Sequence, residues 1–167
     1  MPQASVFESL NQTVQAQLRG DPTLGLPVVA LRKAPIRFTA DSQPGIYVAP
    51  RDEQPVGYAF GGVVIIEYSL DVVIVAPGDQ KLDAQSADGL AQMSLQPQRV
   101  ESVRLLLDVG SFPEGLPSVK ESRWESGPLY DRAALNKNYD VTALRFYYKS
   151  DEVRIQRSIV SNLVRPA

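Results

Sequence analysis

The sequence contains no histidine and no cysteine among its 167 residues. Without cysteine there can be no disulfide, thiolate zinc site, iron–sulfur cluster or cysteine nucleophile. Without histidine the chain lacks the commonest metal ligand, and Ser-His-Asp and HExxH chemistry are excluded. Carboxylate or lysine chemistry remains open, but we expect a protein that is not an enzyme and that uses no cofactor and no metal ion.

Long apolar runs and an excess of charge of one sign are also lacking. The longest runs, VVII and VVIVA, are interrupted by Glu67 and Asp71 and fall far short of the roughly 20 residues of a membrane helix. The amino terminus has neither the basic nor the apolar stretch of a secretory signal. The 17 basic and 19 acidic residues are mixed along the chain, without the basic block of a dedicated nucleic-acid binder. We expect a soluble protein with no membrane contact.

What is present is the pattern of two amphipathic helices. Apolar residues recur at helical spacing over 4–19, where Ser5 and Glu8 fit a capping box. A second helical region is expected over 81–108, in two parts, because Pro97 suits a first-turn position or a kink. Each apolar stripe suits packing against a sheet.

The strongest strand signal is GVVIIEYSLDVVIVAPGD, residues 62–79. One parity is uniformly apolar, and the other contains Glu67, Ser69 and Asp71, so we expect one buried face and one partly hydrated face. A strand of this length predicts a bend near Gly61 and Gly62 or a projecting end.

Shorter strands are predicted on both sides of this segment. They lie within 26–38, at IYVA, around Val119 and Trp124, and at VTALRFYYKS, whereas PRDEQPVGYAFGG has the composition of a loop, though Tyr58 and Phe60 could already belong to the next strand. The order predicts an α+β fold, with an antiparallel or mixed β-sheet and two main helices packed on one face. We expect one domain over 1–167, in which 150–167 form either an extended C-terminal tail or a last strand.

Two sets of polar residues are candidate sites. Asp131, Asn136, Asn138 and Asp140 superficially resemble calcium-ligand spacing, but the required glycine and glutamate of an EF-hand loop are missing. We expect Asp131 to cap a short helix, and Asn138 and Asp140 to turn into the next strand. A carboxylate-dependent hydrolase needs two acids close in space, and the sequence alone does not show such a pair. The adjacent acids of RDEQP and SDEVR are therefore interpreted as solvated loop charges.

Aromatic residues on or near the strands are more numerous than one small core needs. Tyrosine is favoured where one end of the side chain is buried and the other is wet, as at subunit contacts. The candidate contact residues are Tyr58, Phe60, Trp124 and Tyr147, with a position at the edge of the core as the alternative for Trp124. The expected contact surfaces are the segment RDEQPVGYAFGG, the Trp124 region and the C-terminal tail.

The phrases YVAPRDE, YSLDVVIVAPGD and DRAALNKNYDVTALRF, in this order after an amphipathic helix, give the chain a familiar layout. Over most of its length it resembles the tail terminator (tail completion) and neck-type proteins of tailed bacteriophages. It departs from that layout in the interruption of the second helix by Pro97 and in a somewhat long C-terminal tail.

The resemblance implies a structural virion protein that caps the tail tube as a ring, usually of six, and forms the head–tail joining surface. Its partners would be copies of itself, the tail tube protein and head connector or neck proteins, with DNA passing through the lumen without specific binding. It would reside in the tail or neck of the virion, and in the host cytoplasm before assembly. One alternative is another neck, connector or tube component. Another, of a different class, is a small-molecule-binding or carboxylate-dependent hydrolase domain.

Overall fold

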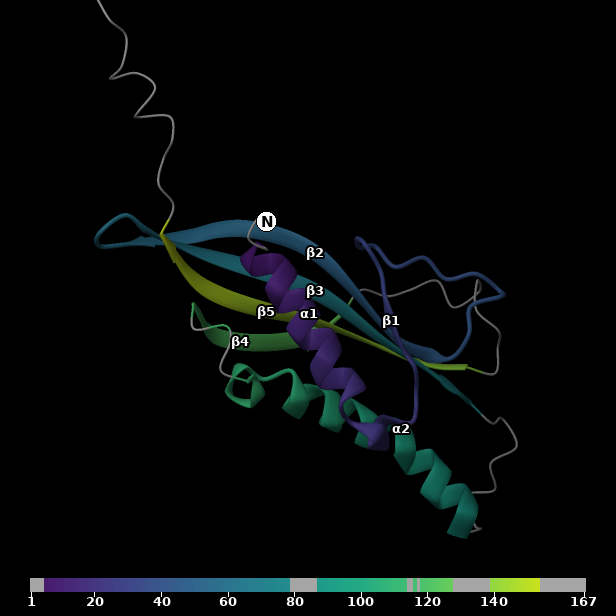
Figure 1. Cartoon of the computed structure of the whole chain (residues 1–167). Helices are drawn as coiled ribbons and strands as arrows, with labels where there is room; N and C mark the ends of the chain where they lie inside the picture. Colours follow the sequence, from purple (N-terminus) through teal and green to yellow (C-terminus); the bar gives the residue numbers. More distant parts are fainter. Residues whose placement is uncertain (1–4, 79–86, 114–115, 117, 128–138, 154–167) are drawn as a thin grey trace, which may run out of the picture.

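The structure, a computed structural model, describes residues 5–78, 87–113, 116, 118–127 and 139–153. The predicted α+β class is confirmed: a five-stranded mixed sheet carries two main helices (Figure 1). The elements are α1 (Val6–Arg19), the 3-10 turn η1 (Pro22–Leu24), β1 (Val28–Ala30), β2 (Gly45–Ala59), β3 (Val63–Pro77), α2 (Ala87–Leu106), the 3-10 turn η2 (Val109–Ser111), β4 (Val119–Ser126) and β5 (Tyr139–Val153).

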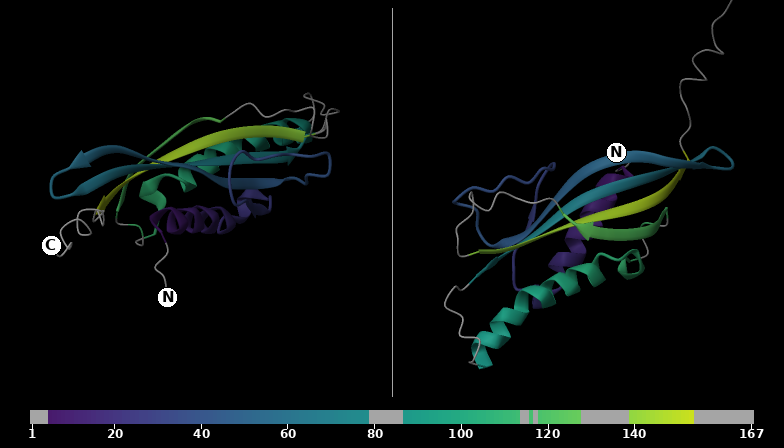
Figure 2. Two further views of the ribbon diagram at one scale, coloured as in Figure 1. Left: turned by 90° about the horizontal axis from the view of Figure 1, so that it is seen from above. Right: turned by 180° about the vertical axis from the view of Figure 1, so that it is seen from behind.

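The strands lie in the order β1-β2-β3-β5-β4. Strand β1 runs parallel to β2, and every other neighbouring pair is antiparallel. The three central strands each have 15 residues, and both helices cover the same face of the sheet (Figure 2). The sheet is therefore longer than the layer of helices that covers it.

Helix α1 begins where the sequence predicts. The Ser5 hydroxyl accepts a hydrogen bond from the Glu8 backbone N–H at 3.1 Å, which satisfies one of the free donors of the first turn. Its stripe of Leu10, Val14 and Leu18 is buried against the apolar parity of β3 and the neighbouring strands. Both features follow from local sequence.

The buried ring of Tyr148 ties the sheet to the end of α2. Its hydroxyl donates a hydrogen bond to the Leu107 carbonyl oxygen at 2.7 Å, and its ring stacks on that of Phe112. Burial, with a smaller contribution from the nearby Asp108, raises the pKa of Tyr148 well above its ordinary value. The folded protein therefore holds this phenol in its neutral form.

Replacing Tyr148 by phenylalanine is expected to lower the free energy of unfolding at pH 7 by about 1 kcal/mol, because the Leu107 carbonyl oxygen loses its partner. The stability conferred by the raised pKa is fully present below about pH 10, the ordinary tyrosine pKa, and is lost as the pH rises toward the folded value. Urea unfolding between pH 7 and 11 should thus fall less steeply with pH for Tyr148→Phe than for the wild type. Parallel slopes would contradict this role of the phenol.

The opposite face of the sheet is only partly hydrated. The segment 31–44 folds over it and buries Ile36 and Phe38 against Val73 and Val75, which belong to the parity predicted to be partly wet. The predicted strand within 26–38 is shorter than expected. Only Val28–Ala30 pair with β2, and the residues that follow cover the sheet as irregular chain. Toward β4 and β5 the same face carries polar and charged side chains.

Two further predictions are wrong. Helix α2 continues through Pro97 instead of dividing there; next to the proline, the Gln96 side chain donates hydrogen bonds to the Ile74 carbonyl oxygen and the Thr142 hydroxyl, which fix the helix to the sheet. The segment predicted as a loop, PRDEQPVGYA, belongs to β2. The carbonyl oxygen of Pro50 points away from β3 and accepts a hydrogen bond from the Ala34 N–H. The backbone nitrogen of Pro50 lies on the same side of the strand, so the missing N–H does not weaken the pairing with β3, and the proline is tolerated.

Several expectations fall outside the described residues. These are the cap at Asp131, the turn at Asn138 and the arrangement of residues 154–167. Of residues 150–167, positions 150–153 form the end of β5, and the choice between a tail and a last strand stays a prediction.

Candidate subunit interface

A three-stranded extension projects beyond the helices. It consists of residues 54–59 of β2, 63–67 of β3 and 149–153 of β5. Strands β3 and β5 pair in continuous register, whereas the β2–β3 register shifts once, between Pro55 and Gly57. Ile66, at the inner end of the extension, is still buried in the core. Figures 1 and 2 show that neither helix reaches its outer end. Residues 56–62, here called the hairpin tip, form that end.

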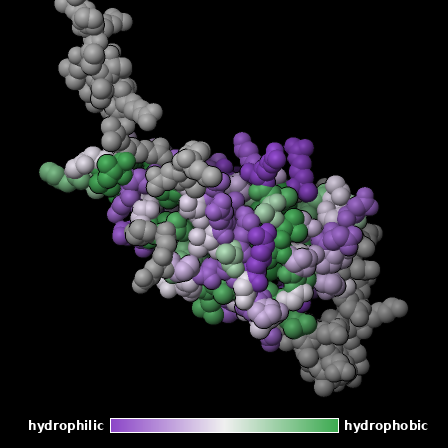
Figure 3. All heavy atoms as spheres, in the orientation of Figure 1, coloured by the Kyte–Doolittle hydropathy of each residue, from purple (hydrophilic) through white to green (hydrophobic). Residues whose placement is uncertain are grey.

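The hairpin tip is apolar and exposed. Tyr58 is 80% exposed and Phe60 fully so, and Val56 and the neighbouring Val153 of β5 are also exposed. Figure 3 shows this hydrophobic patch at the end of the molecule. Two of the four candidate contact residues, Tyr58 and Phe60, thus lie together where no other part of the described chain covers them.

The turn at the tip depends on two glycines. Gly61 and Gly62 have φ angles of 80° and 77°, a left-handed conformation that side chains with a Cβ disfavour. The bend predicted near these residues is therefore the reversal between β2 and β3. It directs Phe60 outward into solvent.

Gly61→Ala is expected to destabilise the protein by about 1 kcal/mol through backbone strain alone, because nothing lies within 4 Å of the added methyl group. Gly57→Ala is the matched control in the same hairpin: its methyl group would meet only the Ile65 side chain, at 3.4 Å, and its φ is not in the left-handed range. The midpoint of urea unfolding measures both. Equal shifts for the two variants would contradict the assigned turn geometry.

The base of the extension is held by a buried ion-pair cluster. Asp71 is 0% exposed, and its carboxylate accepts hydrogen bonds from Arg145 Nε at 2.8 Å and Arg51 Nη1 at 3.2 Å. The hydrogen bond to Asp71 raises the pKa of Arg145 above its ordinary value. The backbone N–H of Asp52 donates to the Ser69 hydroxyl, in a stretch where the β2–β3 register shifts between Pro50 and Glu53. The cluster thereby fixes the bulge from which the extension starts.

The other two candidate residues lie elsewhere. Trp124 of β4 is 44% exposed on the helix-covered face, where the Arg104 guanidinium stacks on its ring at 3.7 Å. Tyr147 of β5 lies on the opposite face, half-buried, with Arg123 stacked on its ring and its hydroxyl donating to Glu125. Burial and the Glu125 hydrogen bond raise the pKa of Tyr147. The four residues therefore do not form one surface.

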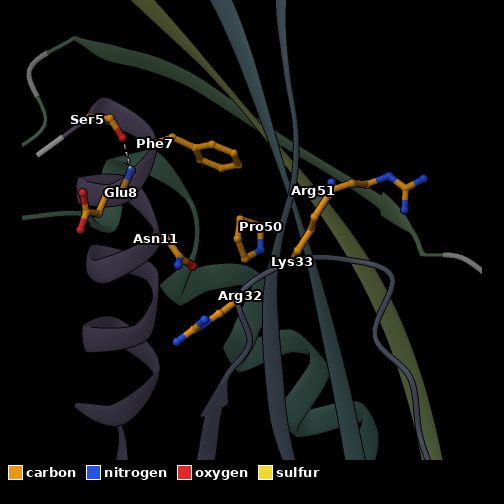
Figure 4. Close-up of a pocket in the computed structure, with 8 residues that line it drawn as sticks. All are labelled: Ser5, Phe7, Glu8, Asn11, Arg32, Lys33, Pro50 and Arg51. Atoms are coloured by element: carbon orange, nitrogen blue, oxygen red, sulfur yellow. Dashed lines mark hydrogen bonds between the residues drawn. The ribbon is translucent and has the colours of Figure 1, made fainter.

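A hollow, here called the basic groove, lies between the start of α1 and the segment after β1. It has a volume of about 390 Å³, and Figure 4 shows its lining: Ser5, Phe7, Glu8, Asn11, Arg32, Lys33, Pro50 and Arg51. One face of the Phe7 ring packs on Tyr68, with ring centres 4.8 Å apart. The groove thus combines an apolar wall with two exposed cations, Arg32 and Lys33, and one acid, Glu8; Arg51 lies at its edge but is paired with Asp52 and Asp71.

Among the described residues, the acids of the polar pocket on the other face of the sheet are each paired with an arginine. A polar pocket of about 190 Å³ next to the Asp71 cluster contains Asp52 and Glu67, but Asp52 is paired with Arg51 at 3.2 Å and Glu67 with Arg123 at 3.4 Å. The acids of RDEQP and SDEVR lie on β2 and β5, not in loops, with β3 between them. Within the described part of the chain, no three acidic side chains are grouped so that they could hold a metal ion.

Sequence reasoning missed the two charged features. Asp71 was expected on a partly hydrated face, whereas it is fully buried; a lone aspartate inside a strongly apolar strand was the available signal that a buried cation faces it. The basic groove had no such signal, because Phe7, Arg32 and Pro50 meet only in the folded chain.

Comparisons with known proteins do not add a family to this geometry. No protein-family model matches the chain, and no curated protein matches it significantly. Among the described helices, none is long and apolar enough to span a membrane.

Proposed function

We propose that this chain is a structural subunit of a tailed phage, a tail terminator that caps the tail tube as a ring of six and presents a joining surface to the head. The observation that carries the assembly part of this proposal is the exposed apolar hairpin tip at the end of a three-stranded extension. Exposed aromatic residues on a well-ordered element are typical of protein–protein contacts. The role requires no catalytic step, cofactor or metal.

The neck assignment rests on the layout of the chain. The sequence resembles tail terminators in the order of an amphipathic helix, the phrases YVAPRDE and YSLDVVIVAPGD, a second helical region and DRAALNKNYDVTALRF. The proposed partners are other copies of the chain, the tail tube protein and the head connector, with DNA crossing the lumen unbound. The near balance of 17 basic and 19 acidic residues suits a lumen that does not retain DNA phosphates.

Deletion of the gene in the phage that encodes this chain tests the proposal. In negative-stain electron micrographs of the lysate, we expect DNA-filled heads beside unattached tails of irregular or excess length. Supplying the chain from a plasmid should restore joined particles. Normal particles from the deletion strain would contradict the neck assignment, and DNA-filled heads without tails of any length would favour a tube subunit instead.

A further inference from the structure

We infer that the hairpin tip of one copy binds in the basic groove of the next copy. This inference rests on the proposed function, since it specifies how copies of the chain contact each other in the ring. It assigns an occupant to the groove and a receptor to the tip.

The tip cannot reach the groove of its own chain. Pro50 of the groove lies in β2 and Phe60 of the tip directly follows that strand, and the nine residues between them span about 30 Å in an extended strand. Pairing with β3 along this length keeps the strand extended. A tip that occupies a groove must therefore come from a second copy.

The two surfaces are chemically complementary. Phe7 and Pro50 offer an apolar wall to an aromatic ring, and Arg32 and Lys33 are exposed beside it. Among the described residues, no carboxylate lies within ion-pair distance of either cation, so both are available to the face of an incoming ring. The groove thus suits Tyr58 or Phe60.

The chain already stacks arginine on aromatic rings. Arg104 lies 3.7 Å from the ring centre of Trp124, and Arg123 lies 3.7 Å from that of Tyr147. These contacts show that this type of pair forms on the surface of this fold. A contact between copies would use the same chemistry.

Charge also differs between the two surfaces. Asp151 and Glu152 of β5 pair with Ile65 and Val64, immediately beside the tip. The groove carries two cations without an ion-pair partner among the described residues, Arg32 and Lys33, and one acid, Glu8. Attraction between the acidic end of one copy and the basic groove of another would orient the approach of the copies.

Such a contact joins two different surfaces, so it is heterologous. Every copy then has one free tip and one free groove until the chain of contacts closes on itself, which generates a ring when the rotation per copy closes and a filament when it does not. The inference therefore explains ring formation without a second type of interface.

Because the chain has no cysteine, engineered thiols report directly on this contact. Ala59→Cys places a thiol in the hairpin tip, and Glu8→Cys places one in the groove; both positions are exposed, and neither change removes an aromatic ring or a cation. An equimolar mixture, with one variant carrying an affinity tag, is treated with a short thiol-specific crosslinker. We expect the mixed dimer at more than ten times the yield of either like-with-like dimer.

The matched control pairs Ala59→Cys with Lys120→Cys, an exposed position on β4 at the far edge of the sheet. This mixture should give only background crosslinking. Multimers in sedimentation velocity without the mixed dimer, or with equal yields in the control, would overturn the tip-in-groove contact and leave ring assembly standing. A chain that is monomeric in solution and missing from particles would overturn both the contact and the proposed function.

Discussion

A chain carrying Tyr58→Ser and Phe60→Ser is expected to fold normally and to lose at least 100-fold in self-association. Both side chains are exposed in the isolated subunit, so their removal creates no cavity. Aromatic residues that fill a pocket at an interface each contribute about 2 kcal/mol or more, and a loss of about 4 kcal/mol corresponds to roughly 1000-fold in affinity. The bound of 100-fold allows for the non-additivity of neighbouring residues.

Sedimentation velocity over a concentration series measures this loss, with circular dichroism to confirm the fold. Leu105→Ser is the matched control, because it removes another exposed large apolar side chain, from α2, which lies away from the tip. The control should sediment like the wild type. If the double variant also sediments like the wild type, the hairpin tip is not a subunit contact.

Asp71→Asn is expected to lower the free energy of unfolding by about 3 kcal/mol. The substitution keeps the shape of the side chain but leaves Arg145 and Arg51 without their buried counter-charge. Removal of one partner from a buried ion pair costs about 3–5 kcal/mol, and the lower end applies because the arginine side chains are 17% and 34% exposed and can be partly hydrated. The bulge at the base of the extension should loosen as well, which hydrogen exchange of residues 51–54 would detect.

Glu121→Gln provides the comparison for this second variant. Glu121 pairs with Lys149 at 3.2 Å, but both side chains are well exposed, so we expect a loss below about 1 kcal/mol. Urea unfolding of the two variants side by side separates buried from surface charge. A loss for Asp71→Asn no greater than that for Glu121→Gln would contradict the role of the cluster.

The sequence predicted elements whose signal is local. The Ser5 cap, the stripe of α1 and the apolar parity of β3 depend on residues within a few positions of one another, and all three appear as expected. The sequence did not predict the full length of β2, because Pro50 and Pro55 are typical of loops. Whether β2 tolerates these prolines depends on how it pairs with β3 and on which edge of the strand is free, and both are set by the tertiary structure.

The candidate site was predictable only in part. The exposure of Tyr58 and Phe60 agrees with a contact role, although the contact itself stays a prediction, as it does for Trp124 and Tyr147. The turn that follows Tyr58 and Phe60 could be anticipated from Gly61 and Gly62. The basic groove could not, since its walls come from three separate segments that only the fold assembles.

Immunogold electron microscopy of intact particles, with antibodies raised against the purified chain, tests the central claim most directly. If the chain is a tail terminator, gold should lie at a single position, the junction between head and tail. In particles made with the Tyr58→Ser/Phe60→Ser variant, that junction should remain unlabelled. Gold along the whole tail, or its absence from purified particles, would contradict a ring at the head–tail junction.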